Sequence, residues 1–585
     1  MASAVDDDAS SSGSGRPAKK NTDHNSKEQR KLDELNDGID FLSKRLSRRQ
    51  AIATGAVAAA AVVGGLAIGG AAGYLLKPST AGTTTATATV TSTLPGPTVT
   101  QTVTSTPTVS SSTLSSIISS VSSSMTGGPG IDYYYDPSLS GLTVNYVAGS
   151  APEHITIDPT FALFTKETGI TVNEDLTTSC VGTIGDTMFA ASSNEYDVLD
   201  AGLLAAQAYT WWKSNYIVPW ANFFDITPAG WDSSDILPLL QTACSTYPTD
   251  DPPNLLLCAP LNLAINCMYY NLAAWSGAGF DTPLPGTVQL NGNPTSGQPV
   301  TYDEIMPTLT KLQGNGKYSY NVETSSPVSN IAYGQTIMWT YGANWLTKDF
   351  TPNFTNQDVM DGFQLYLDLS QKFAPDPTNM NDAEWSSLGS SGEITSGQWT
   401  YNAYDTIFGS GSAETPATFP ACLPPAVNNS ATFIAGQCPV VNAFSSPQQQ
   451  KAAWSLISFM SSPRMMAVYN SMGTTGWRPS IVTSPAATAA ANGNYPLQWS
   501  HAAALELANG GLLGGSSAGS NNTLASEIFI KMPDSLTLVI AVGTELGKIQ
   551  AGSETLAQGM ENLQSSTVSI LKTAGVYGTS YPFGT

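Results

Sequence analysis

The chain has 585 residues and a mass of 61.2 kDa, and 41% of its residues are hydrophobic and 9% aromatic. This length suits more than one lobe, and this apolar content excludes a wholly disordered chain. Only 12% of the residues are charged, and 45 Asp and Glu outnumber 23 Lys and Arg, for a net charge of -22. We therefore exclude a nucleic-acid partner, because binding phosphates requires a basic surface.

The charge is unevenly distributed along the chain. The part after Lys77 holds 12 of the 23 basic residues but 36 of the 45 acidic ones. It is rich in Ser, Thr, Asn, Gly and Tyr, which keep a surface hydrated at any pH. One interpretation is an exterior protein facing acid, where carboxylates become protonated.

The N-terminal segment, residues 1–50, is hydrophilic, but apolar residues recur at helical spacing between Leu32 and Leu46. This pattern predicts an amphipathic helix from Lys27 to Leu46. We interpret residues 1–50 as a cytoplasmic tail whose helix lies on a membrane surface or packs against itself.

An uncharged stretch from Ala51 to Leu76 follows the tail. At about 1.5 Å per residue, a helix of this length crosses a bilayer. Basic residues precede it and only Lys77 follows closely, so the positive-inside rule places the rest of the chain outside the cell. Ser47–Ile52 resembles a twin-arginine export signal. We predict that residues 51–76 remain as a membrane anchor; cleavage in the small-residue run Ala86–Ala88 is the alternative.

Residues 77–130 form a linker in which more than half of the residues are Ser or Thr. Such a composition cannot bury a core, so we predict a disordered, extended stalk that carries the remaining domain away from the membrane.

Residues 131–585 are predicted to fold as an α/β domain. Leu142–Val147 has the apolar content of a buried strand, and the helix after it ends at Gly169, which suits a left-handed cap. Ile170–Val172 then begins a second strand, so the order predicts a βαβ unit in a parallel sheet. Tyr196–Gly202 predicts another strand that ends in a polar loop.

Further motifs follow in a fixed order along this domain. They are Phe164–Val172 (FTKETGITV), Tyr196–Gly202 (YDVLDAG), Tyr269–Asn271 (YYN), Thr301–Ile305 (TYDEI, with Thr301 as N-cap and Glu304 in the capping-box position), Gly397 before Trp399, Ala452–Pro463, Gly476–Pro479 (GWRP) and Ile549–Ala557. The ordered set covers about residues 140–575. It resembles the extracellular solute-binding proteins of ABC importers, in the large two-lobed class that includes maltodextrin binders. The chain departs from that pattern in its six Cys, its scarcity of cations and its Gly/Asn-rich insertion at 286–298.

The resemblance implies a periplasmic-binding-protein-like fold, in which two α/β lobes joined by crossing strands close about a hinge. It implies capture of a sugar or oligosaccharide and delivery to ABC permease subunits, with no cofactor and no catalysis. Aromatic faces stack on sugar rings, while carboxylates and amides bind hydroxyls.

Candidate ligand-binding residues are aromatic, acidic or basic residues near the predicted strand ends and motifs. They are Glu153, Asp200, Trp211, Trp212, Trp345, Trp399, Tyr401, Tyr404, Trp477 and Arg478. Core packing is the alternative for each Trp, and loop capping for each carboxylate. Asp197 is expected to brace the fold, and Arg478 to form an ion pair between the lobes rather than to contact ligand.

All six cysteines lie on the predicted exterior side, where disulfides persist. Spacing suggests the pairs Cys422–Cys438 and Cys244–Cys258, which leaves Cys180–Cys267, although other pairings stay open. No CxxC spacing indicates a metal site. Sequons at Asn353, Asn428 and Asn521 are compatible with glycosylation in exposed loops.

Signatures of catalysis are sparse. The only histidines are His24, His154 and His501, too few on the exterior side for a His-rich metal site. A Gly-x-Ser-x-Gly match at Gly515–Gly519 has no strand before it, which argues against a nucleophile elbow. Two other functions stay open: an anchored extracellular glycosidase, and a surface or structural protein built on the same scaffold.

Overall fold

The computed structural model describes residues 88–92, 99–103, 128–482 and 530–579; within 128–482 it leaves out 129, 150–156, 178–180, 203–204, 285–286, 288–298, 314–316, 401–417, 423 and 472–475. The chain divides into two compact units, Met1–Thr104 and Ser105–Thr585. The predicted amphipathic helix and the predicted anchor lie outside the described residues. Within the described ranges, no helix combines the length and the apolarity needed to cross a membrane.

The predicted stalk contains two short strands, β1 (Ala88–Ser92) and β2 (Val99–Val103), which pair antiparallel with Ala88 opposite Val103. The run of β-branched Thr and Val favours this extended, paired backbone. Most of the remaining linker lies outside the described residues, so the disordered stalk stays a prediction.

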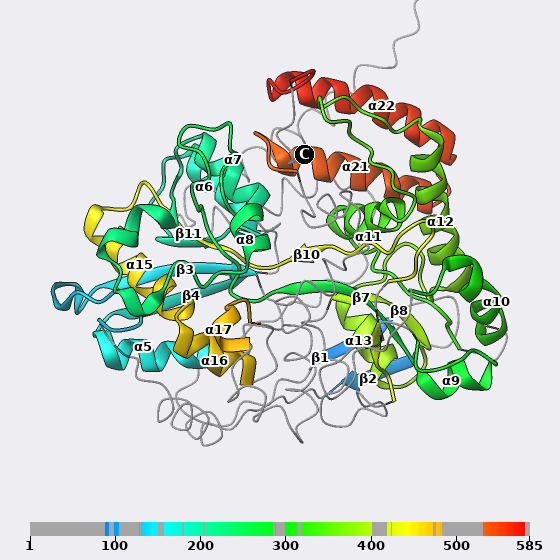
Figure 1. The fold of residues 1–585 in the computed structure, drawn as a ribbon, viewed down its shortest axis with the longest axis horizontal. Helices are drawn as coiled ribbons and strands as arrows, with labels where there is room; N and C mark the ends of the chain where they lie inside the picture. The colour runs from blue at the N-terminus through cyan, green and yellow to red at the C-terminus, as the bar shows by residue number, and fades with distance from the viewer. Residues whose placement is uncertain are drawn as a thin grey trace, which may run out of the picture. The chain divides into compact units, whose positions relative to one another are not determined.

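The larger unit contains two sheets, each covered by its own helices, and we call these halves lobe 1 and lobe 2 (Figure 1). Lobe 1 has the strand order β4-β3-β5-β11-β6, with β3, β4 and β5 parallel and β11 antiparallel to both of its neighbours. Its strands are β3 (Thr143–Gly149), β4 (Thr171–Thr177), β5 (Val198–Asp200), β6 (Ile217–Val218) and β11 (Pro439–Asn442).

The helices of lobe 1 are α5 (Phe161–Thr168), α6 (Val181–Ala190), α7 (Ala205–Lys213), α8 (Pro238–Ala243), α15 (Pro447–Met460), α16 (Pro463–Ser471) and α17 (Pro479–Val482), with 3-10 turns at Pro137–Leu139, Asp158–Thr160, Trp220–Ile226 and Ala229–Trp231. The predicted βαβ unit is confirmed as β3-α5-β4. Gly169 ends α5 with a φ of 72°, and its N–H donates to the Thr165 carbonyl, as a left-handed cap requires.

Lobe 2 has the order β10-β7-β8, with β9 also paired to β7, and all of these pairs are antiparallel. Its strands are β7 (Ala264–Tyr270), β8 (Ser396–Thr400), β9 (Ala421–Cys422) and β10 (Ile434–Ala435). Its helices are α9 (Leu272–Gly277), α10 (Tyr302–Gln313), α11 (Pro327–Trp339), α12 (Gln357–Phe373), α13 (Asp382–Ser390), α21 (Ser535–Gln550) and α22 (Leu556–Thr573).

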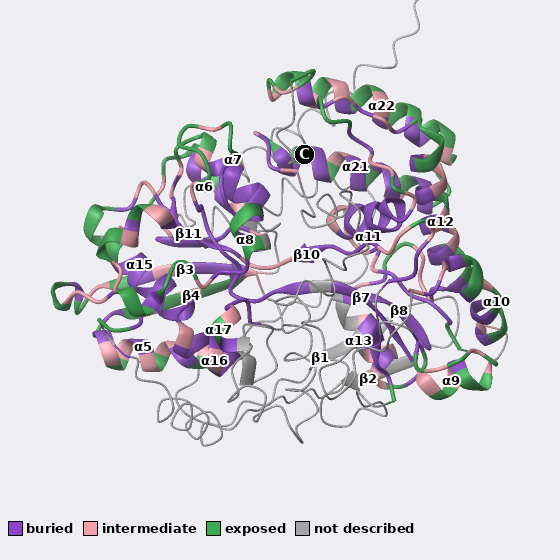
Figure 2. Ribbon diagram, viewed as in Figure 1, coloured by how far each residue is buried: buried purple, intermediate pink, exposed green. Residues whose placement is uncertain are grey.

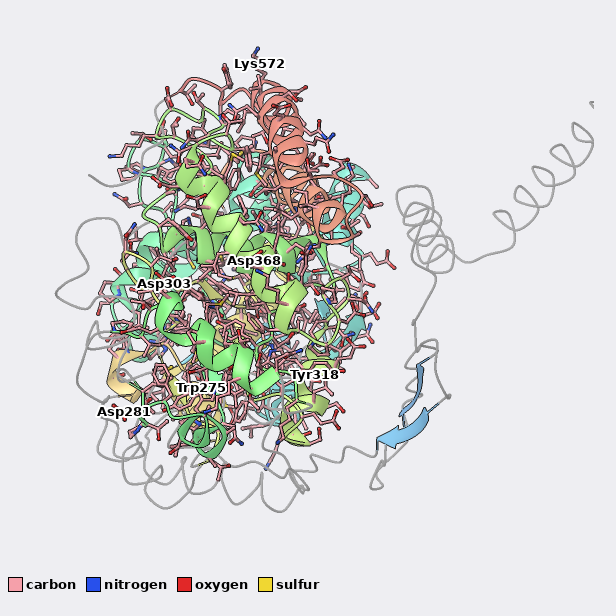
Figure 3. All side chains as sticks on the ribbon, turned by 90° about the vertical axis from the view of Figure 1, so that its right-hand side faces the viewer. Trp275, Asp281, Asp303, Tyr318, Asp368 and Lys572 are labelled. Atoms are coloured by element: carbon pink, nitrogen blue, oxygen red, sulfur yellow. The ribbon has the colours of Figure 1, made fainter. Side chains whose placement is uncertain are left out.

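Local sequence signals set several helix starts in lobe 2. The predicted capping box is confirmed: the Thr301 hydroxyl accepts from the Glu304 N–H at 3.2 Å, and the Glu304 carboxylate accepts from the Thr301 N–H at 2.7 Å. Thr555 and Gln558 form a second capping box ahead of α22. Figure 3 faces this side of lobe 2, with Asp303 on α10 and Asp368 on α12 directed outward.

Two antiparallel segments carry the chain between the lobes, and both are visible in Figure 1 as β7 and β10 extend toward lobe 1. The first runs from Pro260 into β7, and the second runs from β10 to Cys438 just before β11. They are joined by the pair Ile434–Ile265 and by a 2.8 Å hydrogen bond from the Leu261 N–H to the Gln437 carbonyl.

A third connection leads from lobe 1 into α21 of lobe 2. Here the Thr210 hydroxyl donates to the Met532 carbonyl at 2.9 Å, and the Tyr247 hydroxyl donates to the Lys531 carbonyl at 2.9 Å. Figure 2 shows that β3, β7 and β11 are buried while the outer faces of α10 and α22 are exposed. The sheets therefore form the centre of each lobe. Residues 260–264 of the first crossing segment and 531–532 of the third connection are buried, whereas residues 435–437 of the second crossing segment are half-buried.

Candidate ligand-binding site

The parallel strands of lobe 1 end together at one edge of their sheet. Gly149, Thr177 and Asp200 are the last residues of β3, β4 and β5, and helices α6 and α7 begin shortly after β4 and β5. Helix N-termini carry partial positive charge and free N–H groups. In open parallel sheets, ligands bind in the crevice outside this edge, which makes it the candidate site.

Asp200, a predicted ligand contact, lies at this edge with 1% of its surface exposed. Its backbone pairs with Pro439 of β11. The pKa of the neighbouring Tyr146 phenol is raised, first by burial and then by the Asp200 carboxylate. The carboxylate is therefore placed inside the strand edge, beside a protonated phenol.

Asp197 at the start of the same strand segment is a brace, as predicted. It accepts hydrogen bonds from the Asn145 N–H at 3.0 Å, the Ser445 hydroxyl at 2.8 Å and the Gln449 amide at 3.1 Å. These contacts tie β3, the end of β11 and α15 together. Burial raises the pKa of Asp197, and the three hydrogen bonds oppose that rise.

Three buried amides lie on or beside the chain that enters lobe 2. Within the part of the chain that the structure describes, Asn262 Nδ2, Asn266 Oδ1 and both side-chain atoms of Asn321 have no hydrogen-bond partner. Asn262 is on the first crossing segment and Asn266 is on β7. Asn321 lies against β8, where its carbonyl accepts from the Gln398 N–H at 2.8 Å. The chain that enters lobe 2 therefore carries buried, uncharged donor and acceptor atoms that have no partner among the described residues.

The Trp candidates differ in exposure. Trp212 on α7 is half-buried, and the Lys213 ammonium lies 4.8 Å from its ring. Trp345 is buried, stacks on Phe354 and donates to Gln335, while Trp399 is buried and stacks on Trp385 at 4.9 Å between ring centroids. Burial of these last two favours the core-packing alternative. Glu153, Tyr401 and Tyr404 lie outside the described residues.

Trp211 is also buried, in the core of lobe 1. Its indole N–H donates to the Asp186 carboxylate at 2.7 Å, and Gln207 donates to the same oxygen at 2.9 Å. Phe189 meets its ring edge-on at 5.0 Å, and Gly185 provides the room, because a Cβ there would overlap the indole. Trp211 therefore joins α6 to α7 behind the strand edge.

Arg478 is fully buried between the rings of Trp231 and Trp477, with 4.7 and 4.8 Å from the guanidinium to the ring centroids. It donates to the carbonyls of Ser461 and Asp232 and lies 3.6 Å from the Asp235 carboxylate. Burial lowers the pKa of Arg478 to about 10. The predicted ion pair between the lobes is wrong, because these partners all belong to lobe 1.

Arg464 is likewise neutralised inside lobe 1. Its two terminal nitrogens donate to both oxygens of Glu167 at 2.8 Å, and its Nε lies 3.4 Å from Asp132. Arg464 and Arg478 are the arginines of the described residues. Both guanidinium groups are buried against partners from lobe 1, so neither is available to bind a ligand carboxylate.

The family model for bacterial extracellular solute-binding proteins matches residues 160–505, which is more than half of the chain. The chain belongs to this family. A search among curated proteins found no match.

Solved structures share the fold of this solute-binding protein. Maltose-bound MalE3 of T. maritima aligns with a TM-score of 0.60 and 14% identity, over 74% of this chain and 100% of that one. An ABC-transporter solute-binding protein of Agrobacterium radiobacter K84 in complex with ribitol aligns with a TM-score of 0.61 and 16% identity, over 74% of this chain and 99% of that one. One from Agrobacterium vitis S4 with bound D-mannitol aligns with a TM-score of 0.60 and 18% identity, over the same shares of the two chains.

None of the predicted disulfides is found among the described residues of this solute-binding protein. Cys244, Cys258, Cys267, Cys422 and Cys438 are free and buried, and Cys180 lies outside the described residues. The pair Cys422–Cys438 is wrong, because the Cys438 sulfur lies with those of Cys244 and Cys258 while Cys422 is on β9 in lobe 2. Spacing along the chain misled here, since folding separates the neighbours Cys422 and Cys438 into different lobes.

Sequence reasoning missed the buried amides of the solute-binding protein. A signal for two of them was available: Asn262 and Asn266 interrupt an otherwise apolar run that enters β7. A polar amide in a buried strand requires a partner, and a ligand is one of the partners that can supply it.

Proposed function

We propose that this protein is the membrane-tethered, extracellular substrate-binding component of an ABC importer, which captures a sugar, oligosaccharide or polyol and delivers it to permease subunits. Family membership and the two lobes joined by crossing strands support capture by closure. Residues 51–76 serve as the anchor and residues 77–130 as the linker that holds the lobes outside the cell.

The observation that carries the ligand class is a set of buried amide atoms without a partner: Asn262 Nδ2, Asn266 Oδ1 and both side-chain atoms of Asn321. The other amide atoms of Asn262 and Asn266 bond to Gln437 and Gln398. Hydroxyl groups satisfy amide donors and acceptors without adding charge. Both described arginines are held by carboxylates and carbonyls of lobe 1. Maltose, ribitol and D-mannitol, bound by proteins of the same fold, are uncharged polyhydroxy compounds of this chemistry.

We keep Asp200 and Trp212 as proposed ligand contacts on lobe 1, with Glu153, Tyr401 and Tyr404 as proposed contacts from outside the described residues. Asp200 stands at the carboxyl edge of the sheet, and Trp212 is the least buried of the candidate tryptophans that the structure describes. Trp211, Trp345, Trp399, Trp477 and Arg478 serve the cores of the lobes. Asn428 is exposed and remains a proposed glycosylation site, as do Asn353 and Asn521.

The first experiment titrates the purified full-length chain in detergent with maltose, ribitol, D-mannitol and a peptide mixture. Trp fluorescence and melting temperature report binding, and a reducing-end assay reports turnover. We expect at least one carbohydrate to raise the melting temperature and to be recovered unchanged. A response to peptides alone would overturn the ligand class, and release of reducing ends would favour the glycosidase.

A matched pair of variants locates the site. Asn321→Leu removes an amide with no protein partner, so we expect the affinity for the bound carbohydrate to fall by at least about 10-fold while folding stability holds or rises. Asn330→Leu removes an amide that donates to the Gly543 carbonyl and accepts from the Tyr366 hydroxyl, so it should lower stability without a specific loss of affinity. Equal affinity in the wild type and Asn321→Leu would remove Asn321 from the site.

A further inference from the structure

Three thiols meet where lobe 1 joins the two crossing segments. Cys244 caps the end of α8, Cys258 lies just before the first crossing segment, and Cys438 lies at the end of the second. Their sulfur atoms are all within 4.8 Å of one another, and each residue is fully buried. The cluster is therefore built from three separate parts of the chain.

Backbone hydrogen bonds hold the segments that carry the three residues. The Leu257 N–H donates to the Cys244 carbonyl at 2.9 Å, which holds Cys244 beside the segment that carries Cys258. The Ala201 N–H donates to the Cys438 carbonyl at 2.8 Å, at the carboxyl end of β5. The sulfurs are thus presented to one another by the framework of lobe 1 rather than by flexible loops.

A buried cation accompanies the thiols. Lys531, with 2% of its surface exposed, donates to the carbonyls of Ser245 at 2.9 Å and Thr242 at 3.0 Å. Its ammonium lies 4.5 Å from the centre of the Tyr247 ring. Ser245 follows Cys244 directly in the chain, so this buried cation lies close to the cluster and offsets negative charge on the sulfurs.

We propose that Cys244, Cys258 and Cys438 bind one thiophilic metal ion, Cu(I) or Zn(II), at the junction of the two lobes. Thiolate ligands select these ions. A metal–sulfur bond of about 2.3 Å places bound sulfurs about 3.8 Å apart, so chelation needs only a small inward shift. A disulfide would use two of the three sulfurs and leave the third without a role.

Binding is a ligand exchange and requires no oxidant. The ion loses water, up to three S–H protons pass to solvent, and three metal–sulfur bonds form. Three sulfurs suit Cu(I), whereas Zn(II) takes a fourth ligand such as water. The Lys531 ammonium offsets the negative charge of the trithiolate complex in either case. The bound ion would link α8 to both crossing segments and stiffen the pivot of the lobes.

The test uses the reduced full-length chain under anaerobic conditions, titrated with Cu(I) or Zn(II) against a chromophoric chelator. We expect one ion per chain, with the melting temperature raised by the metal and restored by excess chelator. Cys438→Ser and Cys258→Ser should weaken binding by at least about 10-fold. The matched controls Cys422→Ser and Cys267→Ser remove buried thiols outside the cluster and should leave binding unchanged.

Two measurements on the wild type require no variant and keep the proposal testable if a variant fails to fold. X-ray absorption of the loaded chain should show three sulfur ligands at about 2.3 Å. Peptide mapping of the air-purified chain should show these three cysteines free of disulfides. Any of three results would overturn the proposal. They are a metal shell of oxygen or nitrogen ligands, equal binding by Cys438→Ser and the wild type, and a disulfide within the cluster.

Discussion

Lobe 1 and lobe 2 stabilise their interiors differently. Lobe 1 buries charge: Arg464 pairs with Glu167 and Asp132, and Arg478 lies between two Trp rings beside Asp235. In lobe 2 many of the described buried contacts join neutral groups, such as the Gln398 amide, which donates to the Tyr302 hydroxyl at 2.7 Å. Its buried carboxylate, Glu545, pairs with Lys548, whose side chain is 47% exposed.

Among the described residues, each ion pair of lobe 2 includes a lysine whose side chain is about half exposed. Lys372 and Asp368 pair one turn apart on α12, and their side chains are 55% and 30% exposed. Water and salt screen such a pair, whereas the Arg464 side chain is only 4% exposed. Loss of one buried partner leaves an uncompensated charge, so equivalent substitutions should have very different costs in the two lobes.

The largest effect is expected for Arg464→Met. It leaves Glu167 and Asp132 buried without their cation, so the free energy of unfolding of lobe 1 should fall by about 3–5 kcal/mol. Hydrogen exchange of β3 and β4 in the full chain, together with denaturant unfolding, measures this change.

Lys372→Met is the matched substitution in lobe 2 and should change stability by less than about 0.5 kcal/mol. If Lys372→Met costs as much as Arg464→Met, the contrast between the lobes is not electrostatic.

Gly543→Ala should cause the next largest loss of stability, because the backbone of Gly543 lies in close contact with another helix. In α21 a Cβ at this position would overlap the Pro327 carbonyl oxygen at the start of α11, so α21 must move outward at a cost of about 1–3 kcal/mol. Because the contact is steric, the loss should not depend on salt. Gly277→Ala in α9, where a Cβ would meet nothing within 4 Å, is the control and should be neutral or stabilising.

The capping box of α10 should give a smaller effect. Thr301→Ala removes the hydroxyl that accepts from Glu304, and we expect a loss of about 1 kcal/mol. Thr310→Ala on the same helix removes an exposed hydroxyl that bonds only to the Met306 carbonyl. Thermal unfolding with equal losses in both variants would contradict a capping role.

The smallest effect concerns pH and Asp197. Burial places its folded pKa above the unfolded value of about 3.9, so its contribution to stability is full below the unfolded pKa and is lost as pH rises through the folded pKa. The contribution of Asp197 should therefore grow as pH falls through its folded pKa toward the unfolded value, and this pH-dependent contribution should be missing in Asp197→Asn. Identical pH profiles of hydrogen exchange in β3 for the wild type and Asp197→Asn would contradict this role of Asp197.

Local features of this protein follow from the sequence alone. The β3-α5-β4 unit, the Gly169 cap and the Thr301–Glu304 capping box depend on residues within a few positions of each other, and all three are as predicted. The two α/β lobes were instead implied by the resemblance of the ordered motifs to those of ABC-importer solute-binding proteins.

Tertiary structure alone decided which side chains fill the core, which stay partly exposed and which meet at the junction of the lobes. Trp211 and Trp212 are neighbours, yet one is buried against Phe189 and the other is half exposed. Cys258 and Cys438 are far apart in sequence but adjacent in space. The physical reason is that burial and contact depend on surfaces brought together from distant segments, which no local pattern of residues records.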